Sequence, residues 1–259
     1  MGLRTWLGLK RPKKSAPPPA SDPRWKDLKT RAFGMLPPAV YEEIYCTAFH
    51  GPELDIVEIG GAAGAASIAA ALGLKESGKS SRVIVVEKLQ GGSRDRYGDY
   101  ATNLNTIRGN FRAFDVESHV VLFPERITFE NAGRVKALIE TPQISALMID
   151  ADGKINRDLA LFGPMLAESG KIIIDDYRDD ATRFRADGGG TKLVKVFRLA
   201  NYLIGAGMLK VERQIGSTLF CTVPPGADLS LIDQNECERI VKGVEAYRQQ
   251  YVAQQAAAG

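Results

Sequence analysis

Three aspartates stand where two apolar segments of the sequence end. SALMID (145–150) ends at Asp150, and GKIIID (170–175) ends at Asp175 and is followed by Asp176. In a doubly wound sheet the carboxyl ends of neighbouring strands line one crevice, so these side chains are expected to meet there. Three converging carboxylates repel one another, and a divalent cation would remove that cost. Oxygen ligands suit Mg²⁺, Ca²⁺ or Mn²⁺ rather than zinc.

A second explanation of these acids remains open. They would need no metal if they capped loops and paired with Lys154 or Arg178. Lys154 is also the nearest candidate for a general base, and Asp150 is the other residue expected to take part in catalysis. Neither histidine competes with it, because His50 precedes the first expected strand and His119 starts a strand at the opposite end of the sheet.

A glycine turn supplies the second group of candidate residues. IVEIGGAAGAASIAAAL (56–72) has the pattern of a buried strand, a glycine turn and an alanine-rich helix. The dinucleotide-binding pattern GxGxxG, started at Gly60, would require glycine where the chain has Ala62 and Ala65. The spacing therefore disfavours a dinucleotide and leaves other adenosine-containing cofactors open.

The carboxylates beside this turn indicate which cofactor it holds. Glu58 lies at the lip of the turn formed with Gly60, Gly61 and Gly64, where it would repel a pyrophosphate and attract a cation. S-adenosylmethionine (SAM) carries an ammonium and a sulfonium and has no phosphate. Glu87 ends the next apolar segment, RVIVVE, where an acid can accept both ribose hydroxyls of an adenosine. The turn with Glu58 favours SAM over NAD, whereas Glu87 supports an adenosine-containing ligand without choosing between the two.

One phosphate-loop pattern, GLKESGKS (73–80), has the wrong context. A working phosphate loop follows a strand and opens a helix, so that helix amides point at the phosphate. Here a helix precedes the pattern and a strand follows it. We interpret it as a polar helix-to-strand turn.

The elements that must position these residues alternate along the chain. Short, nearly continuous apolar runs are typical of strands buried on both faces, and strand–helix alternation predicts a parallel sheet with right-handed crossovers. The pattern predicts an antiparallel hairpin over 209–223, because two strand-like runs meet there across one glycine. The other expected strands lie at 54–59, 82–87, 119–130, 145–150 and 170–175, and the expected helices near 63–77, 97–114, 192–204 and 234–255.

The glycine turn, Glu87, IDADG (149–153) and IIIDDY (172–177) together resemble the class I SAM-dependent methyltransferases. Within that class the chain is most similar to metal-dependent O-methyltransferases of the macrocin (sugar) type, and more distantly to the catechol and caffeoyl-CoA type. The resemblance spans about 56–223. It implies an α/β, Rossmann-like, doubly wound and mostly parallel seven-stranded sheet with a C-terminal antiparallel hairpin.

The resemblance also assigns roles to particular residues. Asp150, Asp175 and Asp176 match the positions of the metal ligands, with Mg²⁺ the expected ion, and Asp150 also belongs to the cofactor-binding set. Asn131 and Ala132 would border the adenine. Lys154 falls one residue beyond the lysine position of the catechol-type motif, which leaves its role as base open.

Composition limits the other functions. The 259 residues are 44% hydrophobic and 25% charged, as is ordinary for a globular protein, and no apolar run reaches the roughly 18 residues of a membrane span. Three scattered cysteines form no metal-type spacing, and a cytoplasmic location is expected. Residues 1–31 hold nine of the 34 Lys/Arg and two of the 31 Asp/Glu, so the remainder has 25 basic and 29 acidic residues. Nucleic-acid binding by this mildly acidic body is not expected.

The sequence predicts three parts and one leading function. Residues 1–24 are expected to form a basic, proline-rich flexible leader, which leaves open a weak membrane or protein contact. Residues 25–53 are expected to form a helical segment that covers an acceptor site, and 54–259 the methyltransferase domain. The expected reaction is metal-assisted O-methylation of a small hydroxyl acceptor such as a sugar unit, a polyketide or a phenol. An NAD-dependent oxidoreductase, a non-catalytic SAM-binding scaffold and a homodimer remain open.

Overall fold

The computed structural model describes residues 21–91, 95, 97–178 and 190–258. The proposed leader therefore lies outside the described residues up to position 20, and so does most of the polar loop 178–190. Asp22 is described, and its carboxylate caps the first helix by accepting a hydrogen bond from the Arg24 amide at 2.9 Å. Within these ranges, no helix has both the length and the apolar character needed to cross a membrane.

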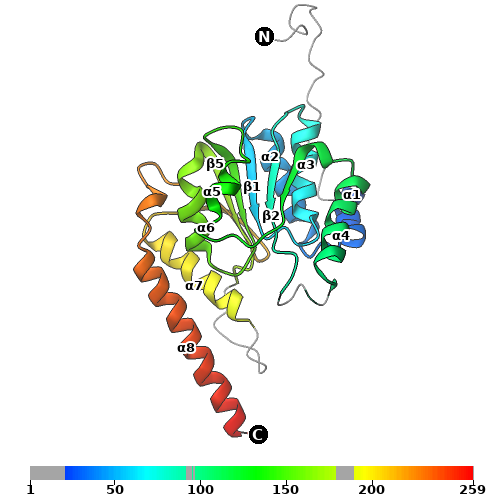
Figure 1. Cartoon of the computed structure of the whole chain (residues 1–259). Helices are drawn as coiled ribbons and strands as arrows, with labels where there is room; N and C mark the ends of the chain where they lie inside the picture. Colours follow the sequence, from blue (N-terminus) through cyan, green and yellow to red (C-terminus); the bar gives the residue numbers. More distant parts are fainter. Residues whose placement is uncertain (1–20, 92–94, 96, 179–189, 259) are drawn as a thin grey trace, which may run out of the picture.

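A seven-stranded sheet of order β3-β2-β1-β4-β5-β7-β6 forms the centre of the described molecule (Figure 1). The first five strands are parallel, and β7 is antiparallel to both β5 and β6. This confirms the predicted α/β fold with its terminal hairpin. The strands are β1 (Asp55–Ile59), β2 (Val83–Val86), β3 (Val120–Phe123), β4 (Ile144–Ile149), β5 (Leu166–Ile174), β6 (Lys210–Ile215) and β7 (Thr218–Thr222).

Helices cover both faces of the sheet, with α1 to α4 on one side and α5 to α7 on the other (Figure 1). The strand residues alternate between the two cores: Ile56 packs with the first group of helices and Val57 with the second. The helices are α1 (Pro23–Arg31), α2 (Pro38–His50), α3 (Ala65–Glu76), α4 (Tyr100–Ala113), α5 (Ala132–Lys136), α6 (Ile155–Phe162), α7 (Thr191–Gly205) and α8 (Gln234–Ala258).

One predicted strand segment was too long. The run ITFE, expected to belong to the strand at 119–130, is a loop and a turn, and β3 stops at Phe123. The Thr128 amide donates to the Asn131 side chain at 2.8 Å, and the Asn131 amide donates to the Thr128 hydroxyl at 3.3 Å. These local bonds favour a turn over a strand. Phe129, which made the run look apolar, is exposed.

The pattern GLKESGKS is a structural turn, as interpreted from the sequence. Its lysine, Lys79, is buried and donates to the main-chain carbonyls of Ala48, Phe49 and Gly51 at 2.5, 2.9 and 2.7 Å. An ammonium at the carboxyl end of a helix satisfies carbonyls that the helix leaves unpaired. Lys79 thus ties α2 to the turn after α3.

The connection between α1 and α2 is also held by hydrogen bonds. The Gly34 amide donates to the Leu28 carbonyl at 2.9 Å, and the Leu36 amide donates to the Tyr41 hydroxyl at 3.1 Å. The side chains on either side of Gly34, Phe33 and Met35, are exposed to 61% and 59%. The N-terminal helices are thus part of the folded body.

Gly73 marks the close approach of α3 to α2 and allows a test of this packing. A Cβ atom there would lie 2.5 Å from the Tyr45 carbonyl oxygen and 2.9 Å from the Ala48 Cβ. We expect Gly73→Ala to lower the free energy of unfolding by about 1–3 kcal/mol, because overpacking outweighs the gain in helix propensity. Urea unfolding measures this change, provided that the dependence of the free energy on urea concentration is the same in the variant and the wild type.

Gly109→Ala is the matched control for that substitution. Gly109 lies within α4, and a Cβ there would have nothing within 4 Å. Its replacement should raise the free energy of unfolding by up to about 1 kcal/mol through helix propensity alone. Equal effects of the two substitutions would show that α2 and α3 do not pack as described.

Candidate active site

The glycine turn joins β1 to α3 and lies against the carboxyl end of β4. Gly60 has φ +100°, and a Cβ atom there would lie 2.6 Å from the Asp150 carbonyl oxygen. A Cβ at Gly61 would overlap the side chain of Val85. Ala62 also has a positive φ, +51°, a strained conformation that is common at functional sites. The turn therefore places main-chain atoms, without side chains over them, at the carboxyl ends of the strands.

Glu87 and Asn110 hold this turn in place. The Ala62 and Leu89 amides donate to the two carboxylate oxygens of Glu87 at 2.7 and 3.2 Å. The Asn110 side chain donates to the Ala63 carbonyl at 2.8 Å. Glu87 therefore stands beside the turn, as the sequence predicted, and its carboxylate is already oriented by main-chain amides.

Glu58 is buried beneath the turn and accepts a short hydrogen bond from the Ser67 hydroxyl. Burial, together with the charges of Asp150 and Glu87, raises the pKa of Glu58 to about 8 against the opposing effect of the Ser67 hydrogen bond. The ionised form of Glu58 is thus costly without a partner. A cationic group placed beside it would be favoured.

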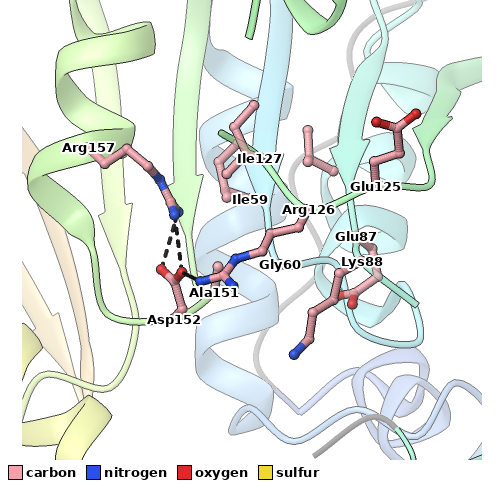
Figure 2. Close-up of a pocket in the computed structure, with 11 residues that line it drawn as sticks. Ile59, Gly60, Glu87, Lys88, Glu125, Arg126, Ile127, Ala151, Asp152 and Arg157 are labelled. Carbon is pink, nitrogen blue, oxygen red and sulfur yellow. Dashed lines mark hydrogen bonds and ion pairs between the residues drawn. The ribbon is translucent and has the colours of Figure 1, made fainter. Parts of the chain in front are cut away.

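A cavity of about 270 Å³ opens next to the turn (Figure 2). Its walls come from the ends of β1, β2 and β4 and from the loop after β3, and they combine apolar with charged side chains. The lining residues are Ile59, Gly60, Val86, Glu87, Lys88, Glu125, Arg126, Ile127, Ala151, Asp152 and Arg157. A volume of this order suits the bicyclic base and the sugar of a nucleoside.

Asp152 stands between two arginines at one wall of this cavity (Figure 2). Arg126 Nη2 lies 2.6 Å from Asp152 Oδ2, and Arg157 contacts both carboxylate oxygens at 3.1 and 3.2 Å. Burial acts to raise the pKa of Asp152, but Arg157 and Arg126 outweigh it and lower the pKa to about 2. Arg157 also pairs with the buried Asp158 at 2.7 Å. This wall is therefore a fixed ionic network.

Asn131 and Ala132 lie outside the lining of the cavity. Asn131 instead braces the loop after β3, where its side chain donates to the Arg126 carbonyl at 2.8 Å. Ala132 is buried at the start of α5. Arg126 and Ile127, just before these two residues, form the wall, so a direct contact of Asn131 or Ala132 with an adenine stays a prediction.

The three aspartates do lie together, at the carboxyl ends of β4 and β5. Ile149 and Ile174 are register partners in β4 and β5, so the residues that follow them are adjacent. Ligand atoms of Asp150, Asp175 and Asp176 lie within 4.8 Å of one another. Asp176 has φ +64°, a left-handed conformation that aspartate tolerates better than most residues.

Each of these acids already has a donor. Asp175 Oδ1 accepts hydrogen bonds from the hydroxyls of Thr218 at 2.7 Å and Ser217 at 3.3 Å. Asp150 and Asp176 share the Nζ of Lys192, which lies 2.5 Å from Asp150 Oδ1 and 2.6 Å from Asp176 Oδ2. Burial raises the pKa of Asp150 to about 7, opposed by Lys192 and reinforced by Asp175 and Asp176.

Lys192 is the site residue that sequence reasoning missed. It lies in the first turn of α7, 42 residues after Asp150, and the sequence proposed Lys154 or Arg178 as partners instead. Lys154 is the residue that precedes α6, and its side chain is exposed. Its role as a base stays a prediction.

A second cavity, of about 300 Å³, lies on the other side of Glu87 and is more apolar. Part of its wall is the fixed connection between α1 and α2, which the sequence predicted to cover an acceptor site. The lining residues are Phe33, Met35, Ala62, Ala63, Glu87, Leu89, Tyr97, Asn103 and Thr106. Glu87 thus borders both cavities.

Solved structures to which the chain is similar in fold include methyltransferases. A methyltransferase from Podospora anserina, PaMTH1, bound to SAH, is 14% identical, with 82% of this chain and 90% of that chain covered and a TM-score of 0.54. TomG from Streptomyces achromogenes, an O-methyltransferase in complex with SAM, is 15% identical, with coverage of 85% and 93% and a TM-score of 0.53. An O-methyltransferase from Bacillus cereus with SAH is 16% identical, with coverage of 85% and 88% and a TM-score of 0.50.

No family model matches the chain, and no curated protein matches it either. At identities of 14–16% the likeness to these structures establishes the fold. It agrees with the strand order and the terminal hairpin described above.

Proposed function

Because the chain has the fold of class I methyltransferases, we propose that it is a SAM-dependent O-methyltransferase acting on a small hydroxyl compound. The observation that carries the proposal is the nucleoside-sized cavity between Glu87 and Asp152, bordered by the glycine turn. Such a cavity, placed at the carboxyl ends of the strands, is where ligands bind in doubly wound sheets. The solved structures with SAM or SAH support the same cofactor.

The cofactor is proposed to lie across the turn. Its adenine would enter between Ile127 and Ile59, and its ribose hydroxyls would be accepted by Glu87. Its methionine half would pass Gly60 towards Asp150, with the ammonium near Glu58. This direction places the cationic end of SAM near the carboxylates of Glu58 and Asp150, and its uncharged adenosine end in the first cavity.

The reaction requires little more than alignment. The acceptor oxygen attacks the sulfonium methyl group in line, the new O–CH₃ bond forms as the S–CH₃ bond breaks, and SAH leaves as a neutral thioether. Holding the two reacting atoms near contact supplies much of the acceleration in such displacements. The hydroxyl proton must go to a base, for which Asp150 and Lys154 remain the proposed residues.

Metal assistance is a separate hypothesis. The acids Asp150, Asp175 and Asp176 are the donor set for which Mg²⁺ was predicted, and their oxygen atoms are near enough to one another to share an ion. The ammonium of Lys192, however, contacts two of the three. With Lys192 in this position the donor set does not fit a divalent ion, and we assign no step to one.

The acceptor is proposed to have an apolar or aromatic body. Phe33, Met35, Leu89 and Tyr97 give the second cavity an apolar lining, and such surfaces bind rings and alkyl groups. This agrees best with the phenol-like and polyketide acceptors among the predicted classes.

Titration calorimetry with SAM tests the proposal. The wild type should bind SAM saturably, and Glu87→Ala should weaken binding about a hundredfold through the loss of two charge-assisted hydrogen bonds. Glu117→Ala, which removes an exposed acid far from the cavity lining, is the control and should bind like the wild type. Absence of saturable SAM binding by the wild type would refute the assignment.

The same titration separates the alternatives. Saturable binding of NAD⁺ without SAM binding would identify an oxidoreductase. Binding of SAM, with no SAH formed in the presence of a vicinal diol probe such as 1,2-dihydroxybenzene or of other phenols, would favour a scaffold.

A further inference from the structure

Lys192 occupies the centre of the acid cluster. Its Nζ has three acceptors at hydrogen-bond distance: Asp150 Oδ1 at 2.5 Å, Asp176 Oδ2 at 2.6 Å and the Asp150 main-chain oxygen at 3.1 Å. An ammonium has three protons, so this arrangement uses all of them. Lys192 therefore joins the ends of β4 and β5 to the first turn of α7.

Lys192 offsets part of the negative charge of this cluster without an added ion. Burial acts to lower the pKa of Lys192, but Asp150 and Asp176 outweigh it and raise the pKa above the ordinary value of a lysine. Asp175, the third acid, is stabilised by the hydroxyls of Thr218 and Ser217. Groups of the chain itself thus relieve part of the repulsion that led us to predict a divalent cation.

A divalent ion at this place would conflict with Lys192. It would need carboxylate oxygens at about 2.0–2.6 Å, and one carboxylate oxygen each of Asp150 and Asp176 already contacts Nζ. Two positive charges a few ångströms apart repel strongly in a half-buried site. Metal and ammonium are therefore alternatives at this cluster.

We propose that Lys192 is a tethered cation that takes the place of a divalent metal at the acid cluster, so that methyl transfer by this protein needs no metal. The part of the proposal that concerns methyl transfer rests on the proposed function. The part that concerns Lys192 in place of a metal ion does not, because it can be measured on the protein without SAM. Lys192 acts here as a positioning residue. It holds the carboxylates of Asp150 and Asp176 in place and does not itself give up a proton.

Calorimetry with Mn²⁺, in the absence of SAM, tests this occupancy. The wild type should show no saturable binding up to about 1 mM. Lys192→Met removes the ammonium and leaves the carboxylates unbalanced, so the variant should gain Mn²⁺ affinity by at least about a hundredfold. The additional substitution Asp176→Asn should abolish the gain. Lys192→Arg keeps the charge and should bind Mn²⁺ no better than the wild type.

Lys195→Met is the matched control. Lys195 lies one turn further along α7 and pairs with Glu245 on α8 at 2.6 Å, away from the cluster. Its removal should leave Mn²⁺ binding as weak as in the wild type. A purely structural role of Lys192 would predict the same for Lys192→Met.

Two results would overturn the proposal: saturable Mn²⁺ binding by the wild type that Asp176→Asn abolishes, or a folded Lys192→Met variant with no gain in Mn²⁺ affinity. If Lys192→Met does not fold, the wild-type titration decides by itself. SAM binding is measured separately, so a failure of this proposal is distinguishable from a failure of the proposed function. With an acceptor in hand, turnover of the wild type should also withstand a chelator.

Discussion

Gly60→Ala is expected to weaken SAM binding by at least about a hundredfold, although it adds a single methyl group. The new Cβ would lie 2.6 Å from the Asp150 carbonyl oxygen and 2.8 Å from the Ala151 amide nitrogen, which are main-chain atoms that cannot turn aside. Alanine would also be strained at φ +100°. The turn must therefore move away from the end of β4, which opens the space between the two halves of the cofactor site. Titration calorimetry with SAM measures the loss.

Gly78→Ala separates the effect of crowding from that of backbone strain. Gly78 has φ +72°, and a Cβ there would have nothing within 4 Å. This control should lose about 1–2 kcal/mol of unfolding free energy and bind SAM like the wild type. Binding of SAM by Gly60→Ala within about threefold of the wild type would show that the turn does not carry the cofactor.

Glu58→Gln is expected to change how stability depends on pH. Burial raises the pKa of Glu58 in the folded protein to about 8, whereas the unfolded chain has the ordinary value near 4.5. Between these values the folded state holds a proton that the unfolded state lacks, so the free energy of unfolding falls as pH rises, by roughly 1.4 kcal/mol per pH unit. Glutamine cannot ionise, so the free energy of unfolding of the variant should not decrease in this way as pH rises. The variant should therefore be more stable than the wild type at pH 8. Urea unfolding between pH 5 and about 8.5 measures both slopes.

Glu58→Gln, which should stabilise the free protein at pH 8, should at the same time weaken its binding of SAM. The ammonium of SAM favours the ionised carboxylate, so SAM affinity of the wild type should rise with pH up to about 8, and binding should release a proton. Glu58→Gln should bind SAM more weakly and without proton release, which calorimetry in buffers of different ionisation enthalpy detects. Glu117→Gln, a substitution at an exposed acid, is the control. An unchanged proton release in Glu58→Gln would mean that Glu58 does not face the cofactor.

The parts of the site that could be predicted from the sequence are those set by local patterns. Strand ends carry Asp150 and Asp175, and a fixed spacing of glycines defines the turn, so periodicity alone brings these residues to one edge of the sheet. Lys192 could not be found in this way. Its contact with Asp150 depends on how α7 returns across the sheet after the loop 178–190, and no local pattern encodes that path.

The one strand segment that was predicted too long has the same origin. ITFE looked like a strand because its apolar residues were counted without the bonds between Thr128 and Asn131 that close a turn. GLKESGKS matches a phosphate loop by residue type, but its context predicted a turn, and its Lys79 is bound to the main-chain carbonyls of Ala48, Phe49 and Gly51. In both places the partners of polar groups, rather than residue type, decide the structure.

The fixed connection between α1 and α2 has a consequence for substrate choice. Phe33 and Met35 flank Gly34, whose amide is hydrogen-bonded to Leu28, and the next residue, Leu36, is hydrogen-bonded to Tyr41. Lys79 in turn joins α2 to the turn after α3. An acceptor that reaches these side chains meets a backbone that is already ordered, so binding forfeits little chain entropy. Selectivity for acceptors at this side of the second cavity then depends on the shapes of the Phe33 and Met35 side chains. Substituting either residue would change which acceptors bind and leave the fold intact.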